Sequence, residues 1–407
     1  MKHALRRGRG CGTWADTMPI AFGVVIVLVL VVLAAVGCGS NPTGGTTAPV
    51  TGSVGTGTQT TSRREVSTSK SPSLPPDAPA GSASTSIIPS GSLTGAGPAN
   101  PEPVISEWAM AFRKLHPDVT ISYQVVPSAE GTTQFTERTV DFGATNIFMT
   151  DEEISAAEQA SGAEVLHIPG FLDAVVIAHT LPGISKLRLD PATLAAIFLG
   201  SITAWDDPRI AALNPGLTLP SLDITVVHRS DPSFTTFRFT SYLSLASEEW
   251  NNKVGSGRTV NWPVGTGVRD NAALDLFGNM RGTIGYVEFG AALQNDLPVV
   301  ELKNESGNFV APTLASVAAA AQGTQFPTDL RLSLFDSVNP QAYSIVTATW
   351  ILAHDPMEDA AKAGLLKTFL KWALSPAGDA LVEEVGFVPL ADDLRSAALA
   401  KISQIGS

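Results

Sequence analysis

The sequence predicts an α/β protein with mainly parallel sheets, divided into two domains. Apolar β-type runs alternate with runs at helical spacing from about residue 86 to the C-terminus. The chain has 407 residues, of which 44% are hydrophobic, so a large core can form. Residues 86–407 are too many for one ordinary domain, which favours two.

Ordered structure is expected to begin at Thr85–Ile88, and the individual elements follow in chain order. A helix is expected over 104–115, where Val104, Ile105, Trp108, Phe112 and Leu115 share a face and Pro101 and Pro103 suit its start. Alternating or continuous apolar runs predict strands at 119–126, 140–146, 175–181, 223–229 and 348–354. Further helices are predicted at 130–139, 191–200, 358–374 and 376–385, and the stretch His228–Phe239 leads into another.

The first 38 residues predict a secretory signal. Basic residues (Lys2, Arg6, Arg7 and Arg9) precede an apolar run, 20–36, and small residues stand directly before Cys38. This arrangement resembles the bacterial lipobox, in which the cysteine is lipidated after cleavage. The alternative is an uncleaved transmembrane anchor, because the apolar run is just long enough to span a bilayer. Both alternatives place the rest of the chain outside the cytoplasmic membrane.

Residues 39–85 are mostly Ser, Thr, Gly and Pro, a composition that predicts a disordered tether. The two cysteines, Cys11 and Cys38, both precede it, so the body contains no thiol. A disulfide framework, a thiolate metal site and a cysteine nucleophile are therefore excluded.

Net charge and motif content argue against several classes of function. The net charge of −12 argues against nucleic acid as a partner, because no basic stripe is present to neutralise phosphates. A small anion stays possible, since distant surface charge is screened beyond roughly 8–10 Å. The six histidines lack the short spacings of a zinc site, and neither a nucleophile elbow nor a P-loop occurs. We therefore expect no metal, no cofactor and no enzymatic activity.

Three loops combine glycine or hydroxyl residues with a strand-to-helix turn: 95–103, 125–135 and 228–237. Helix N-termini offer unpaired N–H groups and partial positive charge, so converging helix starts can hold an anion. Arg229 would add a bidentate fork that Asp231 orients. The alternative is purely structural: Ser128 and Ser233 would be helix N-caps, and Arg229 with Asp231 a surface ion pair.

Several longer stretches resemble one family. LAAIFLGSITAWDDPRIAALNPG, WNNKVGSGRTVNWPVGTG, GTIGYVEFGAALQN and GFVPL are similar to the phosphate-binding lipoproteins of bacterial phosphate ABC transporters. The resemblance covers about Ser86 to the C-terminus. It implies a two-lobed periplasmic-binding-protein-like fold, each lobe a mixed sheet flanked by helices, with two strands crossing near Val175–Leu181 and Ser344–Trp350. Lobe I would comprise 86–178 and 346–407, and lobe II 179–345.

The resemblance also implies a function: an extracytoplasmic, lipid-anchored monomer that captures inorganic phosphate for an ABC permease. Its motifs carry over to particular positions here. The second-lobe pattern R-x-D-G-S-G-T is matched by Arg229, Asp231, Ser233 and Thr235, while Pro232 and Phe234 replace glycines. The implied ligand-binding positions are Ala99, Asn100, Ser128, Asn146, Arg229, Ser233 and Thr235.

Departures from the family pattern have physical consequences. Asn146 stands where the family has an aspartate, and a neutral amide should discriminate less between phosphate and sulfate. Ala99 replaces a threonine, which removes a donor worth on the order of 1 kcal/mol. The ring of Phe234 must lie on the lobe or in the cleft, and Glu130 would compete with an anion for N–H groups.

These departures keep two other functions open. The scaffold could bind a different oxyanion or no ligand, as a sensor or interaction protein. An extracytoplasmic hydrolase is the third possibility, which the absence of an activated nucleophile disfavours.

Overall fold

The computed structural model describes residues 90–269, 272–335 and 337–406. All of these residues belong to one unit, 82–407. The predicted signal segment with Cys38, the tether 39–85 and the expected start of order at Thr85–Ile88 lie outside the described residues. Within the described ranges, none of the helices combines the length and apolarity that crossing a bilayer requires.

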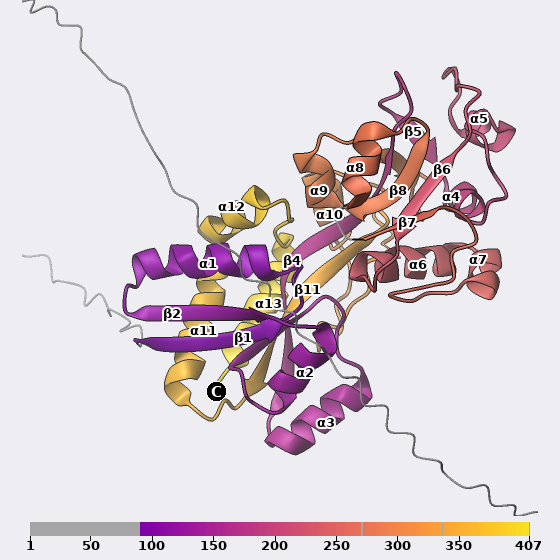
Figure 1. Ribbon diagram of the computed structural model, residues 1–407. Helices are drawn as coiled ribbons and strands as arrows, with labels where there is room; N and C mark the ends of the chain where they lie inside the picture. Colours follow the sequence, from indigo (N-terminus) through magenta and orange to yellow (C-terminus); the bar gives the residue numbers. More distant parts are fainter. Residues whose placement is uncertain (1–89, 270–271, 336, 407) are drawn as a thin grey trace, which may run out of the picture. The chain divides into compact units, whose positions relative to one another are not determined.

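The described residues form an eight-stranded mixed sheet (Figure 1). In sheet order its strands are β2 (Val119–Val125), β1 (Gly91–Gly97), β3 (Phe142–Thr145), β11 (Val346–Asp355), β4 (Glu164–His179), β8 (Thr283–Glu288), β6 (Thr225–Arg229) and β7 (Thr266–Val268). Pairing is parallel among β1, β2 and β3, and among β6, β7 and β8. At the centre, β11 and β4 run antiparallel to all their neighbours. The expectation of mainly parallel sheets is therefore wrong at the centre, where two long strands join the two parallel groups.

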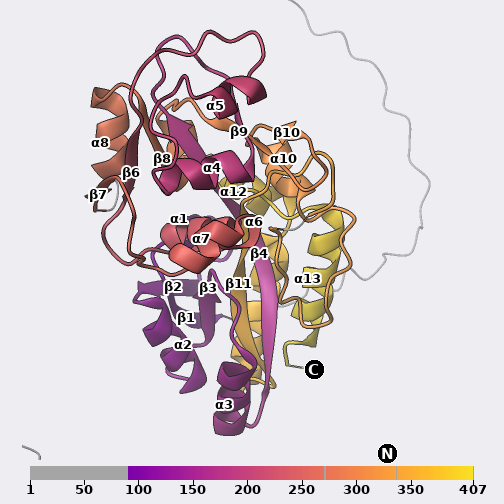
Figure 2. The ribbon, with the colours of Figure 1, turned by 90° about the vertical axis from the view of Figure 1, so that its right-hand side faces the viewer.

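Strands β4 and β11 lie side by side through the middle of the sheet (Figures 1 and 2). The first part of β4, 164–174, pairs with β11, whereas Val175–His179 pairs with β8. The partner of β4 thus changes at 174–175, at the edge of the first predicted strand crossing, Val175–Leu181. Strand β11 starts at Val346, within the second predicted crossing, Ser344–Trp350.

Strand β4 is much longer than the predicted strand 175–181, and it contains a β-bulge. Pro169 and Gly170 lie within the strand, where the register with β11 shifts between Thr349 and Trp350. A proline cannot donate a ladder hydrogen bond, and a bulge is where a strand tolerates that loss.

Helices pack on the β1–β3 part of the sheet and on β4. They are α1 (Glu102–Leu115), α2 (Ser128–Thr136), α3 (Asp151–Ser161), α11 (Ala360–Ala373) and α13 (Asp392–Gln404), and α12 (Pro376–Glu384) packs against α1 and α11. The predicted face of α1 is confirmed, since Val104, Ile105, Trp108 and Phe112 are buried. Leu115 is the exception, because its side chain in the last turn is 58% exposed.

The β6–β8 part carries the remaining elements. Its helices are α4 (Pro191–Phe198), α5 (Pro208–Leu213), α6 (Phe234–Ala246), α7 (Glu248–Lys253), α8 (Ala272–Asn279), α9 (Phe289–Gln294) and α10 (Leu314–Ala319). A second, three-stranded sheet has the order β10 (Phe309–Val310), β9 (Val300–Lys303) and β5 (Leu187–Leu189). A predicted helix, 191–200, and a predicted strand, 223–229, correspond here to α4 and β6.

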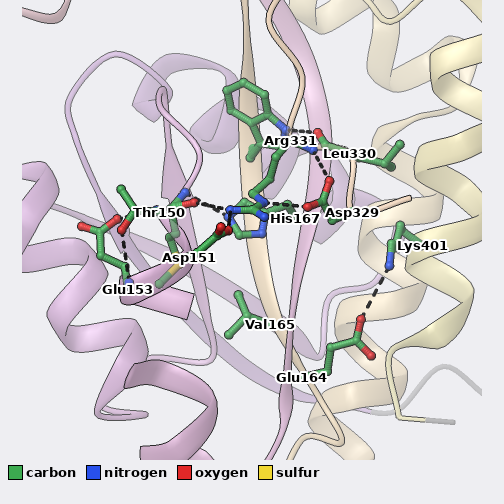
Figure 3. A network of polar contacts seen from close by, with 12 residues as sticks. Thr150, Asp151, Glu153, Glu164, Val165, His167, Asp329, Leu330, Arg331 and Lys401 are labelled. Carbon is green, nitrogen blue, oxygen red and sulfur yellow. Dashed lines mark hydrogen bonds and ion pairs between the residues drawn. The ribbon is translucent and has the colours of Figure 1, made fainter. Parts of the chain in front are cut away.

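Hydrogen bonds and ion pairs connect the segment around Arg331, which precedes β11, with the start of α3 (Figure 3). Arg331 lies 2.8 Å from Asp329 and 2.7 Å from Asp151, and it donates to the carbonyl oxygen of Met149. The N–H of Met149 in turn donates to Nε2 of buried His167 on β4. Burial, with Arg331 nearby, lowers the pKa of His167 to about 4, so this imidazole is neutral at pH 7.

Candidate functional site

A cavity of about 470 Å³ lies where residues from both sides of the β11–β4 pair meet. Its wall includes the loop after β1, the end of β6 with the start of α6, and the end of β8 with α9. Two of the three predicted loops, 95–103 and 228–237, therefore contribute, and no lining residue comes from 125–135. The polar and charged side chains among the lining residues are Asn100, Asp173, Arg229, Ser233, Thr235, Glu288 and Gln294.

The start of α6 presents a capped helix N-terminus to this cavity. Ser233 is the N-cap, and its Oγ accepts from the N–H groups of Thr235 and Thr236 at 3.1 and 3.4 Å. Its hydroxyl proton can still donate, so the capping and ligand-binding interpretations of Ser233 are compatible. The N–H of Ser233 itself donates to the carbonyl of Arg258. Among residues 233–235, the backbone N–H of Phe234 is thus the one without a hydrogen-bond partner among the described residues.

Arg229 is the last residue of β6, and Asp231 orients its guanidinium. Nε of Arg229 donates to Oδ1 of Asp231 at 2.8 Å, and Nη2 contacts the other carboxylate oxygen. The two side chains are only 18% and 26% exposed. The carboxylate of Asp231 therefore fixes the orientation of the guanidinium at the cavity wall.

The ring of Phe234 packs against Arg258 while also lining the cavity. The guanidinium carbon of Arg258 lies over the ring, 4.1 Å from its centroid. A cation at this distance is attracted by the ring face. The ring is half-buried at the wall, which combines the two positions that the sequence left open.

A chain of hydrogen bonds links Asn146 to the cavity floor. Nδ2 of Asn146 donates to Oδ1 of Asn100 and to Oγ1 of Thr349, each at 2.8 Å. Nδ2 of Asn100 then donates to Asp173 at 3.3 Å. Asn100 and Asp173 line the cavity, while Asn146 is buried behind them with its amide oxygen unpaired among the described residues.

Asp173 on β4 forms a buried ion pair with Arg238 on α6. Nη1 of Arg238 lies 2.5 Å from Oδ2 of Asp173, and both side chains are 2% exposed. The other oxygen of Asp173 accepts from the N–H of Ala174. Nε and Nη2 of Arg238 have no hydrogen-bond partner among the described residues. Two buried charges therefore lie close to the cavity, and the attraction between them offsets the cost of removing each from water.

Glu288 contributes a second carboxyl to the cavity wall. Its Oε1 accepts from the hydroxyl of Thr235 at 3.0 Å. Burial and the neighbouring charge of Asp173 raise the pKa of Glu288, against the opposing influence of Arg238 and Arg229. The pKa of this carboxyl is therefore set by the balance between its burial and the charges around it.

Two glycines let the opposite sides of the cavity touch. A Cβ added to Gly290 of α9 would lie 2.8 Å from the carbonyl oxygen of Gly386, which follows α12. Gly386 has φ +85°, and its added Cβ would lie 2.7 Å from Cα of Gly290. Because both positions exclude a side chain, the two backbones approach directly at the rim.

Not all predicted site residues reach the cavity. Ser128, Glu130 and Asn146 are absent from its wall. Ser128 is the first residue of α2 after an N-cap at Pro127, so its interpretation as an N-cap is wrong. Its hydroxyl is buried without a hydrogen-bond partner among the described residues. Glu130 is exposed and accepts a hydrogen bond from Gln134.

Three charged residues near the cavity were not predicted: Asp173, Arg238 and Glu288. A signal was present for two of them. Asp173 interrupts the apolar run FLDAVVIA, and Arg238 interrupts the aromatic run FRF. A lone charged residue inside a buried element requires a partner of opposite charge, so Asp173 and Arg238 were candidates to pair with each other. For the described residues, no group of three or more His, Cys, Asp or Glu is placed to hold a metal ion.

Comparison with known proteins gives the family. Residues 58–377 match the PBP superfamily domain. The phosphate-binding protein PstS of Haemophilus influenzae is 36% identical over 310 residues, covering 75% of this chain and 90% of that protein. PstS of Xylella fastidiosa is 36% identical over 305 residues, covering 74% and 82%. The chain belongs to the PstS family.

Solved structures agree with this PstS assignment in fold. The high-affinity periplasmic phosphate-binding protein PfluDING, bound with phosphate, matches with a TM-score of 0.58 at 20% identity. The match covers 76% of this chain and 93% of that one. At such identity the likeness concerns the fold alone, which is the mixed α/β fold of periplasmic phosphate-binding proteins.

The site of this PstS chain agrees with the sequence expectations best at the end of β6 and the start of α6. Arg229 and Asp231 adopt the predicted arrangement, and Ser233 and Thr235 line the cavity. On the other side, Asn100 connects Asn146 to Asp173. A carboxylate is thus present at the floor of the cavity, although position 146 itself carries an amide.

Proposed function

We propose that this PstS protein captures inorganic phosphate outside the cytoplasmic membrane and delivers it to an ABC permease. It is a binding protein and not an enzyme. The observation that carries the proposal is the arrangement of the Arg229 guanidinium, oriented by Asp231, beside the N-terminus of α6 in one cavity. Guanidinium forks and helix N-termini are the groups that proteins use most for tetrahedral oxyanions.

Each polar group at this end has a definable task. The guanidinium of Arg229 would hold two phosphate oxygens. The hydroxyl of Ser233 and the N–H of Phe234 would donate to the oxygen nearest the helix, because neither proton is committed elsewhere among the described residues. Thr235, whose hydroxyl donates to Glu288, would act through that carboxyl.

Phosphate capture would involve closure of two lobes, 86–178 with 346–407, and 179–345. The cavity volume of about 470 Å³ exceeds what one five-atom oxyanion requires, and cavities of roughly 300–1,000 Å³ commonly hold larger ligands. Bending where β4 changes partner, at 174–175, would move Ala99 and Asn100 towards Arg229. Their backbone would then reach the anion, which makes up for the missing threonine at position 99.

The cellular arrangement in this proposal follows from the N-terminal sequence. Lipid on Cys38 would anchor a monomer to the outer face of the membrane, and residues 39–85 would let the body reach the permease. Mass spectrometry of the protein from membranes tests the anchor. Lipid mass on Cys38 is expected, and a free thiol there would contradict it.

Calorimetric titration of the purified full chain with phosphate tests the binding proposal. We expect saturable binding of one phosphate per chain and loss of at least tenfold in affinity for Arg229→Met, because a charge-assisted pair is worth about 1.5–3 kcal/mol. The matched control is Arg209→Met, which removes an exposed arginine paired in the same way with Asp207. No heat of binding in the parent, or equal loss in both variants, would contradict the proposal.

A second candidate is a scaffold for another oxyanion, and the residue changes at 146 and 234 favour it. The double substitution Phe234→Gly with Asn146→Asp separates the two. If the parent binds phosphate, this variant should change affinity only modestly. If the parent binds none and the variant gains phosphate affinity, the second candidate is correct.

A further inference from the structure

We propose that the cavity also accepts a phosphorus oxyanion that carries a small apolar substituent, an alkylphosphonate, whose alkyl group lies against the apolar part of the wall and the ring of Phe234. The inference rests on the proposed function, because the three oxygens of the phosphonate would occupy the same place beside Arg229 as those of inorganic phosphate. It extends that function to a further class of ligand.

The groups suited to negative oxygens come from one part of the wall. The guanidinium of Arg229, the hydroxyl of Ser233 and the N–H of Phe234 belong to the end of β6 and the start of α6. Two oxygens of a tetrahedral anion can face the guanidinium and a third the helix start. Tetrahedral geometry then directs the fourth substituent on phosphorus away from these donors and into the rest of the cavity.

Most of the remaining wall is apolar. Its apolar side chains come from the loop after β1, from α9, from the segment after α12 and from the start of α6. They are Pro98, Ala99, Pro103, Pro232, Phe234, Ala291, Val385 and Phe387. The three prolines also lack a backbone N–H. A substituent with several hydroxyl groups, such as a sugar, would leave them unpaired against these side chains, whereas an alkyl group needs no partner.

Polar side chains of the same wall are already engaged with one another. The amide of Asn100 accepts from Asn146 and donates to Asp173. The hydroxyl of Thr235 donates to Glu288 at 3.0 Å. An alkyl group beside these residues therefore breaks none of their hydrogen bonds, which is the condition for placing an apolar group there without a large cost.

Room for the substituent remains near the rim when the lobes close. The cavity of about 470 Å³ is larger than a five-atom anion requires. At the rim, a Cβ added to Gly290 would lie 2.8 Å from the carbonyl oxygen of Gly386, so the two backbones already touch. Closure therefore cannot bring Ala291 and Val385, the neighbours of these glycines, much closer together.

The ring of Phe234 is an apolar surface that is already held in place. It is half-buried, and the guanidinium carbon of Arg258 lies over it, 4.1 Å from its centroid. Because the cation is attracted to the ring, a ligand need not order this side chain when it binds. An alkyl group that covers the ring leaves water, which is worth roughly fourfold in affinity for each methylene that is fully buried.

The experiment titrates the full chain by calorimetry with inorganic phosphate and with methyl-, ethyl- and propylphosphonate. The three phosphonates share one headgroup and differ by one methylene each, so the trend in affinity across the series isolates the apolar contact. For the parent, we expect all four ligands to bind and the affinity to rise about two- to fourfold per methylene. Arg229→Met should weaken phosphate and the phosphonates alike, by at least about tenfold.

Two phenylalanine variants test the place of the alkyl group. Phe234→Ala should reduce the gain to less than about twofold per methylene and keep phosphate affinity within about tenfold. Phe309→Ala is the matched control, because its half-buried ring also lies near an arginine, with the guanidinium carbon of Arg188 5.3 Å from its centroid, but does not line the cavity. This control should keep the parent's affinities for all four ligands.

The outcomes separate this inference from the function. If the parent binds phosphate but no phosphonate, or binds the phosphonates more weakly with each methylene, the inference is wrong and the proposed function stands. The inference is also wrong if Phe234→Ala keeps the full gain, or if Arg229→Met weakens phosphate alone. If the parent binds none of the four ligands, the proposed function itself fails.

Discussion

Replacing Asp173 with asparagine should strongly destabilise the protein, because it leaves the guanidinium of Arg238 buried without a counter-ion. Both side chains are 2% exposed and their charged atoms are 2.5 Å apart. Removing one member of such a pair typically costs about 3–5 kcal/mol. That is a large fraction of the roughly 5–15 kcal/mol by which a typical folded protein is stable.

The partner substitution makes this a test of the ion pair itself. Arg238→Met alone should also cost about 3–5 kcal/mol, because it leaves the Asp173 carboxylate buried. The double variant should be much more stable than the sum of the single effects predicts, with a coupling energy of at least ~2 kcal/mol. Urea unfolding, followed by tryptophan fluorescence, gives each free energy of unfolding.

A surface pair provides the control for this cycle. Lys253 and Glu249 on α7 are 61% and 55% exposed, so removing either should change stability by less than about 1 kcal/mol. Additive effects of the Asp173 and Arg238 substitutions would refute the reasoning, because they would show that the two charges do not stabilise each other.

Three further predictions concern pH, the rim of the cavity and the aromatic ring. Burial lowers the pKa of His167 and of His179 from 6.5 to about 4, so the unfolded chain binds protons first as pH falls. These groups should therefore not affect the free energy of unfolding above about pH 6.5, and each should lower it by up to ~3 kcal/mol between about pH 6.5 and about pH 4. Urea unfolding at pH 7 and pH 4.5 measures this loss. If His167→Gln loses as much stability between these pH values as the parent, the prediction is wrong. Gly290→Ala should lower the free energy of unfolding by about 1–3 kcal/mol in thermal or urea unfolding, because its Cβ would lie 2.8 Å from a backbone oxygen. A variant as stable as the wild type would show that the backbones at the rim move apart without cost. Phe234→Ala should lower stability by no more than about 1 kcal/mol from its contact with Arg258 and leave phosphate affinity within about tenfold; complete loss of phosphate binding would mean that the ring itself holds the ligand.

Local patterns in the sequence predict most of the elements near the site. The apolar spacing of α1, the alternation in β2 and the capped start of α6 are all short-range features that the structure confirms. The β4 strand was predicted too short, because its first part, 164–174, pairs with β11, a strand far away in the sequence. Helix α3 was missed, although Thr150 and Glu153 form a capping box that the sequence contains.

The site was predictable on one side only. Arg229, Asp231 and Ser233 lie within five consecutive residues, so their arrangement follows from one strand-to-helix turn. Glu288 meets Thr235 only because β8 pairs with β6 in the sheet, and the pair Asp173–Arg238 joins residues from different elements. Such contacts depend on strand order, which local patterns do not contain.

A crystal structure of the full chain with bound phosphate tests the central claim most directly. We expect the anion in the cavity, with the guanidinium of Arg229 and the hydroxyl of Ser233 within hydrogen-bond distance. Phosphate bound elsewhere on the protein, or the ring of Phe234 occupying the place of the anion beside Arg229, would contradict it.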